Sequence, residues 1–140
     1  MTTTITMTKR LEIDAGHRLV GHEGKCAHLH GHRYAFEITC SADALDNVGR
    51  VIDFSVIKQH VGGWLDKHLD HGFIVNVQDH ALGAFLLETG SKCYVMDGNP
   101  TAENLAALVL WEARVLLGPF GVHVVSVRCY ETPTSSAEAR

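Results

Sequence analysis

The sequence lacks the features by which several common classes of protein are recognised. No apolar run approaches the ~18–20 residues that a membrane-spanning helix needs. Basic residues number 12 against 16 acidic ones, and the resulting net charge of −4 does not favour a general nucleic-acid-binding surface. The first five residues have neither the basic nor the apolar region of a secretory signal. We therefore expect a cytoplasmic protein whose partners are neither membranes nor nucleic acids.

Cysteine pairs, repeats and linkers are missing as well. The four cysteines (Cys26, Cys40, Cys93 and Cys129) include no Cys-x-x-Cys pair, which argues against a disulfide framework and favours reduced thiols. No segment shifts in composition, and a chain of 140 residues with 46% hydrophobic side chains is long enough to bury one core. The sequence therefore predicts a single domain over residues 1–140.

Alternating and helical patterns of apolar residues predict an α+β fold. Strands are expected at residues 4–14, 32–40, 50–52, 73–77, 93–96 and 122–131. Helices are expected from the capping residue Asp53 to Leu69, over residues 81–89, and from the capping residue Thr101 to Leu117. The small and polar residues 132–140 are expected to fray. The expected architecture is a sheet with antiparallel strands and with helices packed on one face.

Histidine is in excess, with ten copies in the chain. His30 and His32 flank Gly31 where a loop enters a strand, and residues i and i+2 of a strand point to the same side. An antiparallel first strand would bring His17 alongside them. Three histidines with an open position form the arrangement of a catalytic zinc site, and surface histidines in a wet loop are the alternative. Zn²⁺ is the expected metal, although the spacing does not exclude Cu, Fe or Ni.

Other residues are candidates for chemistry around such a site. Cys26 precedes His30 by four positions and has three open interpretations: a fourth metal ligand, an ordinary loop thiol, or a nucleophile or base whose pKa is lowered by Lys25 and a nearby metal. Asp70-His71, after the first helix, is either a general acid–base pair or a helix-cap interaction. Glu131 is either an acceptor for the planar N–H edge of a guanidine-like ring or an exposed charge at a strand end.

These residues together resemble the 6-pyruvoyl-tetrahydropterin synthase / 6-carboxy-tetrahydropterin synthase family. Residues 26–32 carry its Cys-x-x-x-His-Gly-His signature, and Ala15-Gly16-His17 lies upstream. The match continues through Gly-Arg-Val-Ile-Asp-Phe at 49–54, Leu-Asp-His at 69–71, Pro-Thr-Ala-Glu-Asn-Leu-Ala at 100–106 and Glu-Thr at 131–132. Each motif alone is modest, whereas the six in register over about residues 5–132 are highly specific.

The resemblance implies a tunnelling fold, in which a four-stranded antiparallel sheet carries two helices on one face and oligomerises into a barrel. Family members form homohexamers, built as dimers of trimers, with active sites between subunits. The resemblance also implies site residues of three kinds: metal ligands His17, His30 and His32; catalytic residues Cys26, Asp70 and His71, which move protons; and pterin-binding residues Glu131 and Thr101.

The reaction that the resemblance implies is the zinc-dependent conversion of 7,8-dihydroneopterin triphosphate to 6-carboxy-5,6,7,8-tetrahydropterin, with release of acetaldehyde and triphosphate. This product is used for queuosine and other 7-deazaguanines. The alternatives are the pyruvoyl branch, which only eliminates triphosphate, and a zinc- or pterin-binding protein without catalysis. An aldolase-like member would carry Glu where Cys26 stands.

The sequence departs from the family pattern at three places. Ile13 stands where an aromatic residue is usual, and residues 72–76 replace a compact Leu-Asn step. Residues 77–99 are longer than the usual short link to Pro100-Thr101. We expect this insertion to affect the choice of substrate more than the metal site, because all three histidines precede it.

Overall fold

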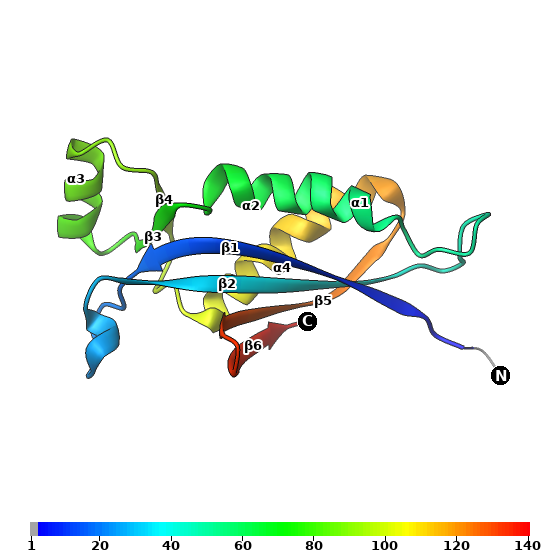
Figure 1. Cartoon of the computed structure of the whole chain (residues 1–140), viewed down its shortest axis with the longest axis horizontal. Helices are drawn as coiled ribbons and strands as arrows, with labels where there is room; N and C mark the ends of the chain where they lie inside the picture. The colour runs from blue at the N-terminus through cyan, green and yellow to red at the C-terminus, as the bar shows by residue number, and fades with distance from the viewer. Residues whose placement is uncertain (1–2) are drawn as a thin grey trace.

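The computed structural model describes residues 3–140, which form one six-stranded sheet with the main helices on one of its faces (Figure 1). The strands lie in the order β4-β3-β1-β2-β5-β6. Their bounds are β1 Thr6–His17, β2 His30–Ser41, β3 Gly72–Asn76, β4 Cys93–Met96, β5 His123–Thr132 and β6 Ser135–Ala139. The helices are α1 Phe54–Ile57, α2 Gly63–His68, α3 His80–Glu88 and α4 Ala102–Leu117, with short helical segments η1 Lys25–Ala27, η2 Lys58–Gly62 and η3 Gly118–Phe120. Among these described residues, no helix is both long and apolar enough to cross a membrane.

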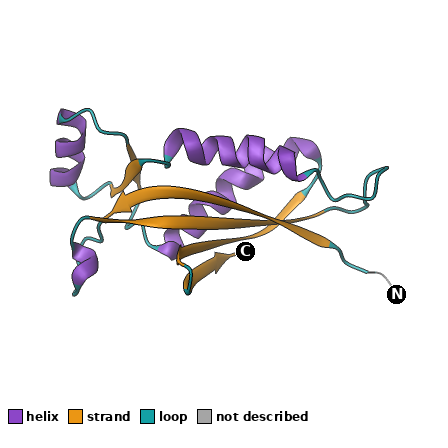
Figure 2. Ribbon diagram, in the orientation of Figure 1, coloured by secondary structure: helices purple, strands orange, loops and turns teal. Residues whose placement is uncertain are grey.

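The core lies between the sheet and the helices. One face of the central strands β1 and β2 is buried, as Ile13 and Phe36 illustrate, whereas their other face carries charged residues such as Glu12. The connected helices α1, η2 and α2 and the long helix α4 cover the buried face (Figure 2), and their own apolar residues, such as Leu65 and Leu105, belong to the same core. Each such side chain contributes about 1.5–3 kcal/mol by leaving water.

The antiparallel pairing of β1 with β2 extends to the histidines. The register pairs Gly16 with Gly31 and His17 with His30, so both strands are longer than the sequence patterns predicted. The two glycines suggested a loop, but they permit close packing at the end of the sheet. A Cβ added at Gly16 would lie 2.6 Å from the Phe73 ring of β3. The pairing of the first two expected strands is therefore confirmed, with ends that glycine shifts outward.

Both long helical segments begin at the capping residues that the sequence indicated. Asp53 accepts a hydrogen bond from the Ser55 amide at 2.8 Å, and Thr101 accepts one from the Asn104 amide at 3.1 Å. The first segment continues through α1, η2 and α2, and its middle part η2 is a π-helix that ends at Gly62. The predicted helices over residues 53–69 and 101–117 are thus confirmed, with a wider turn before Gly63.

The segment β3-α3-β4 adds two strands that run parallel to β1. β3 pairs with β1 only at Ala15 and Gly16, and β4 pairs with β3. The expectation of a four-stranded antiparallel sheet is therefore wrong, because these two parallel strands join the antiparallel strands β1, β2, β5 and β6. Within residues 3–140, no strand pairs with this edge of β1 over residues 6–14. The short helix α3 confirms the helix expected over 81–89 and stands at the left-hand end of Figure 1.

Two smaller expectations are also wrong. Residues 50–52 form a bend instead of a strand, because the Asp46 carboxylate accepts hydrogen bonds from the amides of Val48 and Arg50 and holds the chain in a turn. The C-terminal residues do not fray but turn at Pro133-Thr134 into β6, which pairs antiparallel with β5. Pairing with a neighbouring strand thus compensates for a weak apolar pattern.

Candidate metal centre and its surroundings

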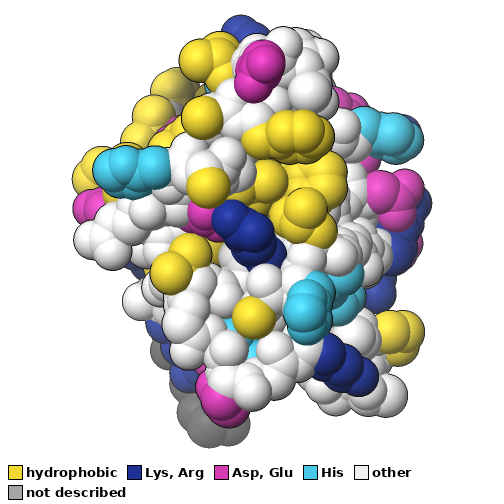
Figure 3. Space-filling view, turned by 90° about the vertical axis from the view of Figure 1, so that its left-hand side faces the viewer, with side chains coloured by type: hydrophobic (Ala, Val, Ile, Leu, Met, Phe, Trp, Pro, Cys, Tyr) yellow, Lys and Arg dark blue, Asp and Glu magenta, His cyan; other side chains and the backbone are white. Residues whose placement is uncertain are grey.

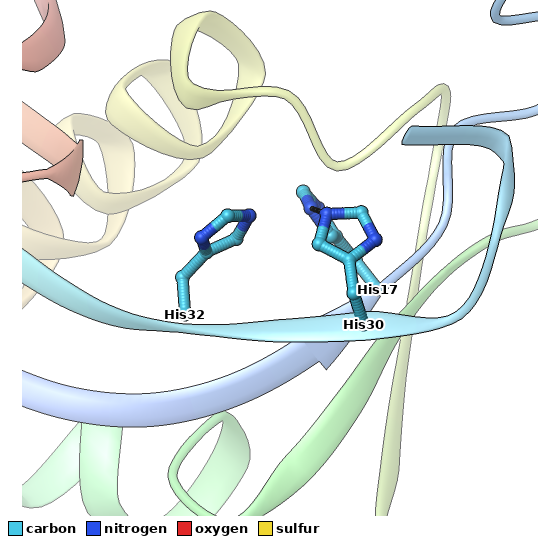
Figure 4. A group of neighbouring side chains, drawn as sticks. All are labelled: His17, His30 and His32. Carbon is cyan, nitrogen blue, oxygen red and sulfur yellow. Dashed lines mark hydrogen bonds between the residues drawn. The ribbon is translucent and has the colours of Figure 1, made fainter. Parts of the chain in front are cut away.

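Three histidine side chains converge on the helix-covered side of β1 and β2 (Figure 4). His17 ends β1, while His30 and His32 begin β2 and lie two residues apart on the same side of the strand. One ring nitrogen from each lies within 4.8 Å of the others, and the two Nε2 atoms of His17 and His30 are 2.9 Å apart. The structure therefore brings together the three histidines that the sequence spacing indicated.

The second nitrogen of two of these rings is held by a backbone carbonyl. His17 Nδ1 lies 2.8 Å from the Pro100 carbonyl oxygen, and His30 Nδ1 lies 2.7 Å from the His28 carbonyl oxygen. A carbonyl only accepts, so both Nδ1 atoms carry the proton and both Nε2 atoms present lone pairs to each other. Such a contact is repulsive without a cation between the rings. The donor set therefore fits a metal ion, with the carbonyls fixing the ring orientations.

His32 gives an independent indication of a metal site. Its Nε2 is buried and has no hydrogen-bond partner, although the Glu131 carboxylate oxygen lies 3.4 Å away. Burial lowers the pKa of both His32 and His17, outweighing in each case an opposing contribution, from Glu131 for His32 and from the Pro100 carbonyl for His17. Neutral imidazole is the form that binds a metal, so these histidines are poised as ligands.

Tyr34 contacts His17 from within the core and was not identified from the sequence as part of the site. Its hydroxyl oxygen lies 3.0 Å from His17 Nδ1, and the residue is completely buried. Burial raises the pKa of Tyr34, and the nearby Glu131 carboxylate adds to this shift, so the phenol stays protonated. Strand alternation could have found it, since Tyr34 follows His32 by two positions.

Cys26 lies in η1, the short helical segment between β1 and β2. It is a free and half-buried thiol whose sulfur is not among the ligand atoms that gather within 4.8 Å of one another. Its backbone carbonyl accepts a hydrogen bond from the Leu19 amide at 2.9 Å, which holds η1 beside the chain that leaves His17. Of the three interpretations of Cys26, the fourth metal ligand is thus the least favoured by the geometry.

Asp70 and His71 form a second group of potential ligands together with Asp14. Asp70 Oδ2 lies 2.9 Å from His71 Nδ1, and Asp70 Oδ1 accepts the Asp14 amide at 3.0 Å. Burial opposes the charge on Asp70, but the hydrogen bonds from the Asp14 amide and the His71 ring together lower its pKa. His71 has φ 60°, in the left-handed region, and donates its amide to the Asp14 carbonyl.

This second group lies on the opposite face of the sheet from the three histidines. Successive side chains of β1 alternate, so Asp14 points away from the face that carries Ile13, Ala15 and His17. The His71 side chain beside it is 77% exposed. Within one chain, the structure therefore does not bring Asp70 and His71 together with the metal-ligating face.

Glu131 and Thr101 differ in their closeness to the centre. Glu131 lies near the end of β5 and reaches His32, as its 3.4 Å contact shows. Thr101 is engaged as the cap of α4, next to the residue whose carbonyl binds His17. The carbonyl of Pro100 is a contact that the sequence did not indicate, because backbone groups carry no residue-specific signal.

Comparison with known proteins identifies the family of the chain. Residues 6–140 match the family 6-pyruvoyl tetrahydropterin synthase. Two curated relatives from Rickettsia bellii and Rickettsia felis, both named 6-carboxy-5,6,7,8-tetrahydropterin synthase, are 41% and 42% identical over 96% of this chain and 99% of theirs. A Haemophilus influenzae protein of the same name is 32% identical over 94% of this chain and 96% of its own.

Solved structures show the same fold. An uncharacterized protein from Wolinella succinogenes has a TM-score of 0.86 at 23% identity, and a catalytic-residue variant of 6-pyruvoyltetrahydropterin synthase from Plasmodium vivax has a TM-score of 0.75 at 19% identity. Each comparison covers 99% of this chain and 98% of the other. With residues 6–140 matched and relatives above 40% identity along nearly its whole length, the chain belongs to the 6-pyruvoyl tetrahydropterin synthase family of enzymes.

Proposed function

We propose that the chain converts 7,8-dihydroneopterin triphosphate and water into 6-carboxy-5,6,7,8-tetrahydropterin, acetaldehyde and triphosphate. The observation that carries this proposal is the 41–42% identity, over 96% of the chain, to relatives named for that product. The product then enters the synthesis of queuosine and other 7-deazaguanines in the cytoplasm.

His17, His30 and His32 hold a zinc ion in this proposal. Three imidazoles with an open fourth position are typical of catalytic zinc. The buried and unpartnered Nε2 of His32 and the facing lone pairs of His17 and His30 support a cation at this place. When bound, Zn²⁺ supplies Lewis acidity that makes a hydroxylated carbon chain easier to deprotonate. The two carbonyl contacts of His17 and His30 preset the ring orientations for this ion.

Glu131 orients the pterin ring. A carboxylate accepts two parallel N–H bonds from the amino group and the adjacent ring nitrogen of a pterin, and such charge-assisted pairs are both strong and directional. Its position 3.4 Å from His32 would keep the ring beside the metal centre. The Thr101 hydroxyl is a weaker second contact, since it already accepts the Asn104 amide.

Cys26, Asp70 and His71 move protons. Asp70 accepts the His71 Nδ1–H, so the other ring nitrogen, Nε2, is free to take or return a proton. Cys26, which lies in η1, is the proton acceptor. Because Asp70 and His71 point away from the three histidines of their own chain, they act at the centre of a neighbouring chain. This arrangement supports a site between subunits of a homohexamer.

The test is product analysis. Zinc-loaded protein is incubated with 7,8-dihydroneopterin triphosphate, and the products are identified by mass spectrometry beside Cys26→Ala. We expect the 6-carboxy product and acetaldehyde from the wild type and a large loss of both in the variant, with zinc retained. A 6-pyruvoyl product would place the chain in the other branch of the family. Bound zinc and pterin without turnover would contradict the proposal and favour a binding protein.

A further inference from the structure

The inserted segment is attached to the residue that follows a metal-ligating histidine. Arg18, next to His17, donates two hydrogen bonds to the Asp79 carboxylate, from Nε and from Nη2, each at 2.6 Å. The Asp79 side chain is only 6% exposed. It also caps α3 by accepting the Leu82 amide at 3.3 Å. One buried carboxylate thus joins the start of α3 to the end of β1 by a bidentate and charge-assisted pair.

The far end of the insertion is attached to the same stretch of chain. The Asn99 side chain exchanges two hydrogen bonds with Val20, accepting its amide and donating to its carbonyl, both at 2.9 Å. The Asn99 side-chain oxygen also accepts an N–H of Asn76 at 3.0 Å. Asn99 precedes Pro100, whose carbonyl orients the His17 ring. Both ends of the insertion therefore contact residues within three positions of His17, Asp79 through the Arg18 side chain and Asn99 through the Val20 backbone.

This attachment bears on how firmly the backbone of His17 is held. His17 is the last residue of β1, so sheet pairing holds its backbone on one side only. After it the chain turns into a loop rich in glycine and charge. A ligand at a frayed strand end would occupy many positions, and each bound metal would have to select one of them, which weakens binding.

We propose that Asp79 and Asn99 are positioning residues, through which the segment of residues 77–99 fixes His17 for metal binding. Asp79 acts through Arg18, and Asn99 acts through Val20 and through the Pro100 carbonyl. The inference rests on the proposed function only in that His17 binds the metal. It gives the insertion a role in the affinity of the centre, where the sequence pattern had suggested substrate choice.

The exposed surface of α3 is a different feature and does not contribute to this role. Phe85 and Leu87 are 57% and 81% exposed, and the view onto this end of the molecule shows hydrophobic side chains gathered there (Figure 3). The attachment to the end of β1 instead uses the buried Asp79, the N-cap residue of α3.

The experiment compares Asp79→Asn with Asp53→Asn. Asp53 is a matched control, because it also caps a helix and binds an arginine, Arg50, but it lies beyond the far end of β2. The zinc dissociation constant of each full-length protein is measured by competition with a chromogenic chelator. We expect Asp79→Asn to weaken zinc binding about 10-fold, as is usual for residues that orient metal ligands, and Asp53→Asn to leave it unchanged. Asn99→Ala should weaken it in the same direction.

A merely structural role of Asp79 makes a different prediction. It would lower the thermal midpoint of the metal-free protein and leave zinc affinity as in the wild type, and that result would overturn the inference. In our proposal, saturating zinc restores the turnover number of Asp79→Asn. If Asp79→Asn does not fold because Arg18 is left unpaired, Arg18→Gln/Asp79→Asn removes both charges. That double variant should show the same loss of zinc affinity, and wild-type affinity in it would equally refute the proposal.

Failure of the proposed function gives a separate signature. A wild-type protein that binds zinc through His17 but does not convert the pterin would contradict the function, while the comparison of zinc affinities would still decide the role of Asp79. A wild-type protein that binds no zinc would contradict both.

Discussion

Two groups of ionisable residues lie on opposite faces of the sheet at β1 and differ in character. His17, His30 and His32 meet on the helix-covered face, where burial lowers the pKa of His17 and of His32 and carbonyls fix the rings of His17 and His30. Asp14, Asp70 and His71 meet on the other face, where the histidine is largely exposed. The first group is preorganised for a cation, whereas the second is open to whatever approaches the sheet. Strand alternation places Asp14 and His17 on opposite faces of β1, and the pairing of β3 with β1 brings Asp70 and His71 to the side of Asp14.

The largest effect is expected from removing one histidine of the buried group. We expect His32→Ala to weaken zinc binding by at least ~100-fold, since zinc binding energies of ~10–16 kcal/mol are shared among few ligands. His28→Ala is the matched control, because only the backbone carbonyl of His28 contacts the centre. Zinc content after dialysis against a chelator would measure both. Equal zinc retention in the two variants would exclude the three-histidine centre.

Removing the exposed histidine should have the opposite pattern. We expect His71→Ala to keep its zinc and to lose turnover by about 100-fold or more, as is usual for a general acid–base. Co-refolding His71→Ala with His32→Ala then tests whether the two groups meet between chains. Activity recovered in the mixture, above that of either variant alone, would show that the two groups meet between chains. Mixtures as inactive as their parts would count against a shared site.

The junction between the two groups can be perturbed at Gly16. A Cβ at this position would lie 2.6 Å from the Phe73 ring, so Gly16→Ala should lower the free energy of unfolding by about 1–3 kcal/mol through overpacking. Gly63→Ala, in α2 with open space around its would-be Cβ, should be neutral or stabilising. Chemical denaturation of both metal-free variants would check this. A Gly16→Ala protein as stable as the wild type would show that Phe73 yields at little cost.

The smallest expected effect is on pH dependence. The pKa values of His17 and His32 are lowered by burial, so the unfolded chain binds more protons than the folded one just below the ordinary value of 6.5. The metal-free protein should therefore keep this contribution above about pH 6.5 and lose it as the pH falls toward the folded pKa values. Thermal unfolding between pH 8 and 5 would measure the slope. His17→Gln/His32→Gln should flatten it, and an unchanged slope would assign the effect to other groups.

Local patterns predicted the convergence of the three histidines and the helix caps, because these depend on neighbours in sequence or on one strand pair. His30 and His32 share a face by strand geometry, and the antiparallel partner supplies His17. The position of Asp70-His71 relative to the centre depends instead on the parallel pairing of β3 with β1, for which the sequence has no local signal. Contacts made by backbone groups, such as that between the Pro100 carbonyl and His17, also leave no signal in the sequence.

Strand pairing, a local side-chain contact and the attachment of the insertion explain the remaining differences. Residues 135–139 have a weak strand pattern, but the antiparallel pairing with β5 satisfies their backbone groups. Residues 50–52 have a strand pattern, but the Arg50 amide donates its hydrogen bond to the Asp46 carboxylate and not to a neighbouring strand. Residues 77–99 could be recognised as an insertion, whereas their attachment through Asp79 and Asn99 required the fold.

The two ends of the sheet limit how copies of this chain could join by strand pairing. On one side the open edge is β4 together with residues 6–14 of β1, and on the other it is β6. Because these edges are different surfaces, a contact that joins β1 of one copy to β6 of the next is heterologous, and its repetition either closes a ring or grows a filament. Pairing of like edges, such as β6 with β6, would instead give a two-fold pair.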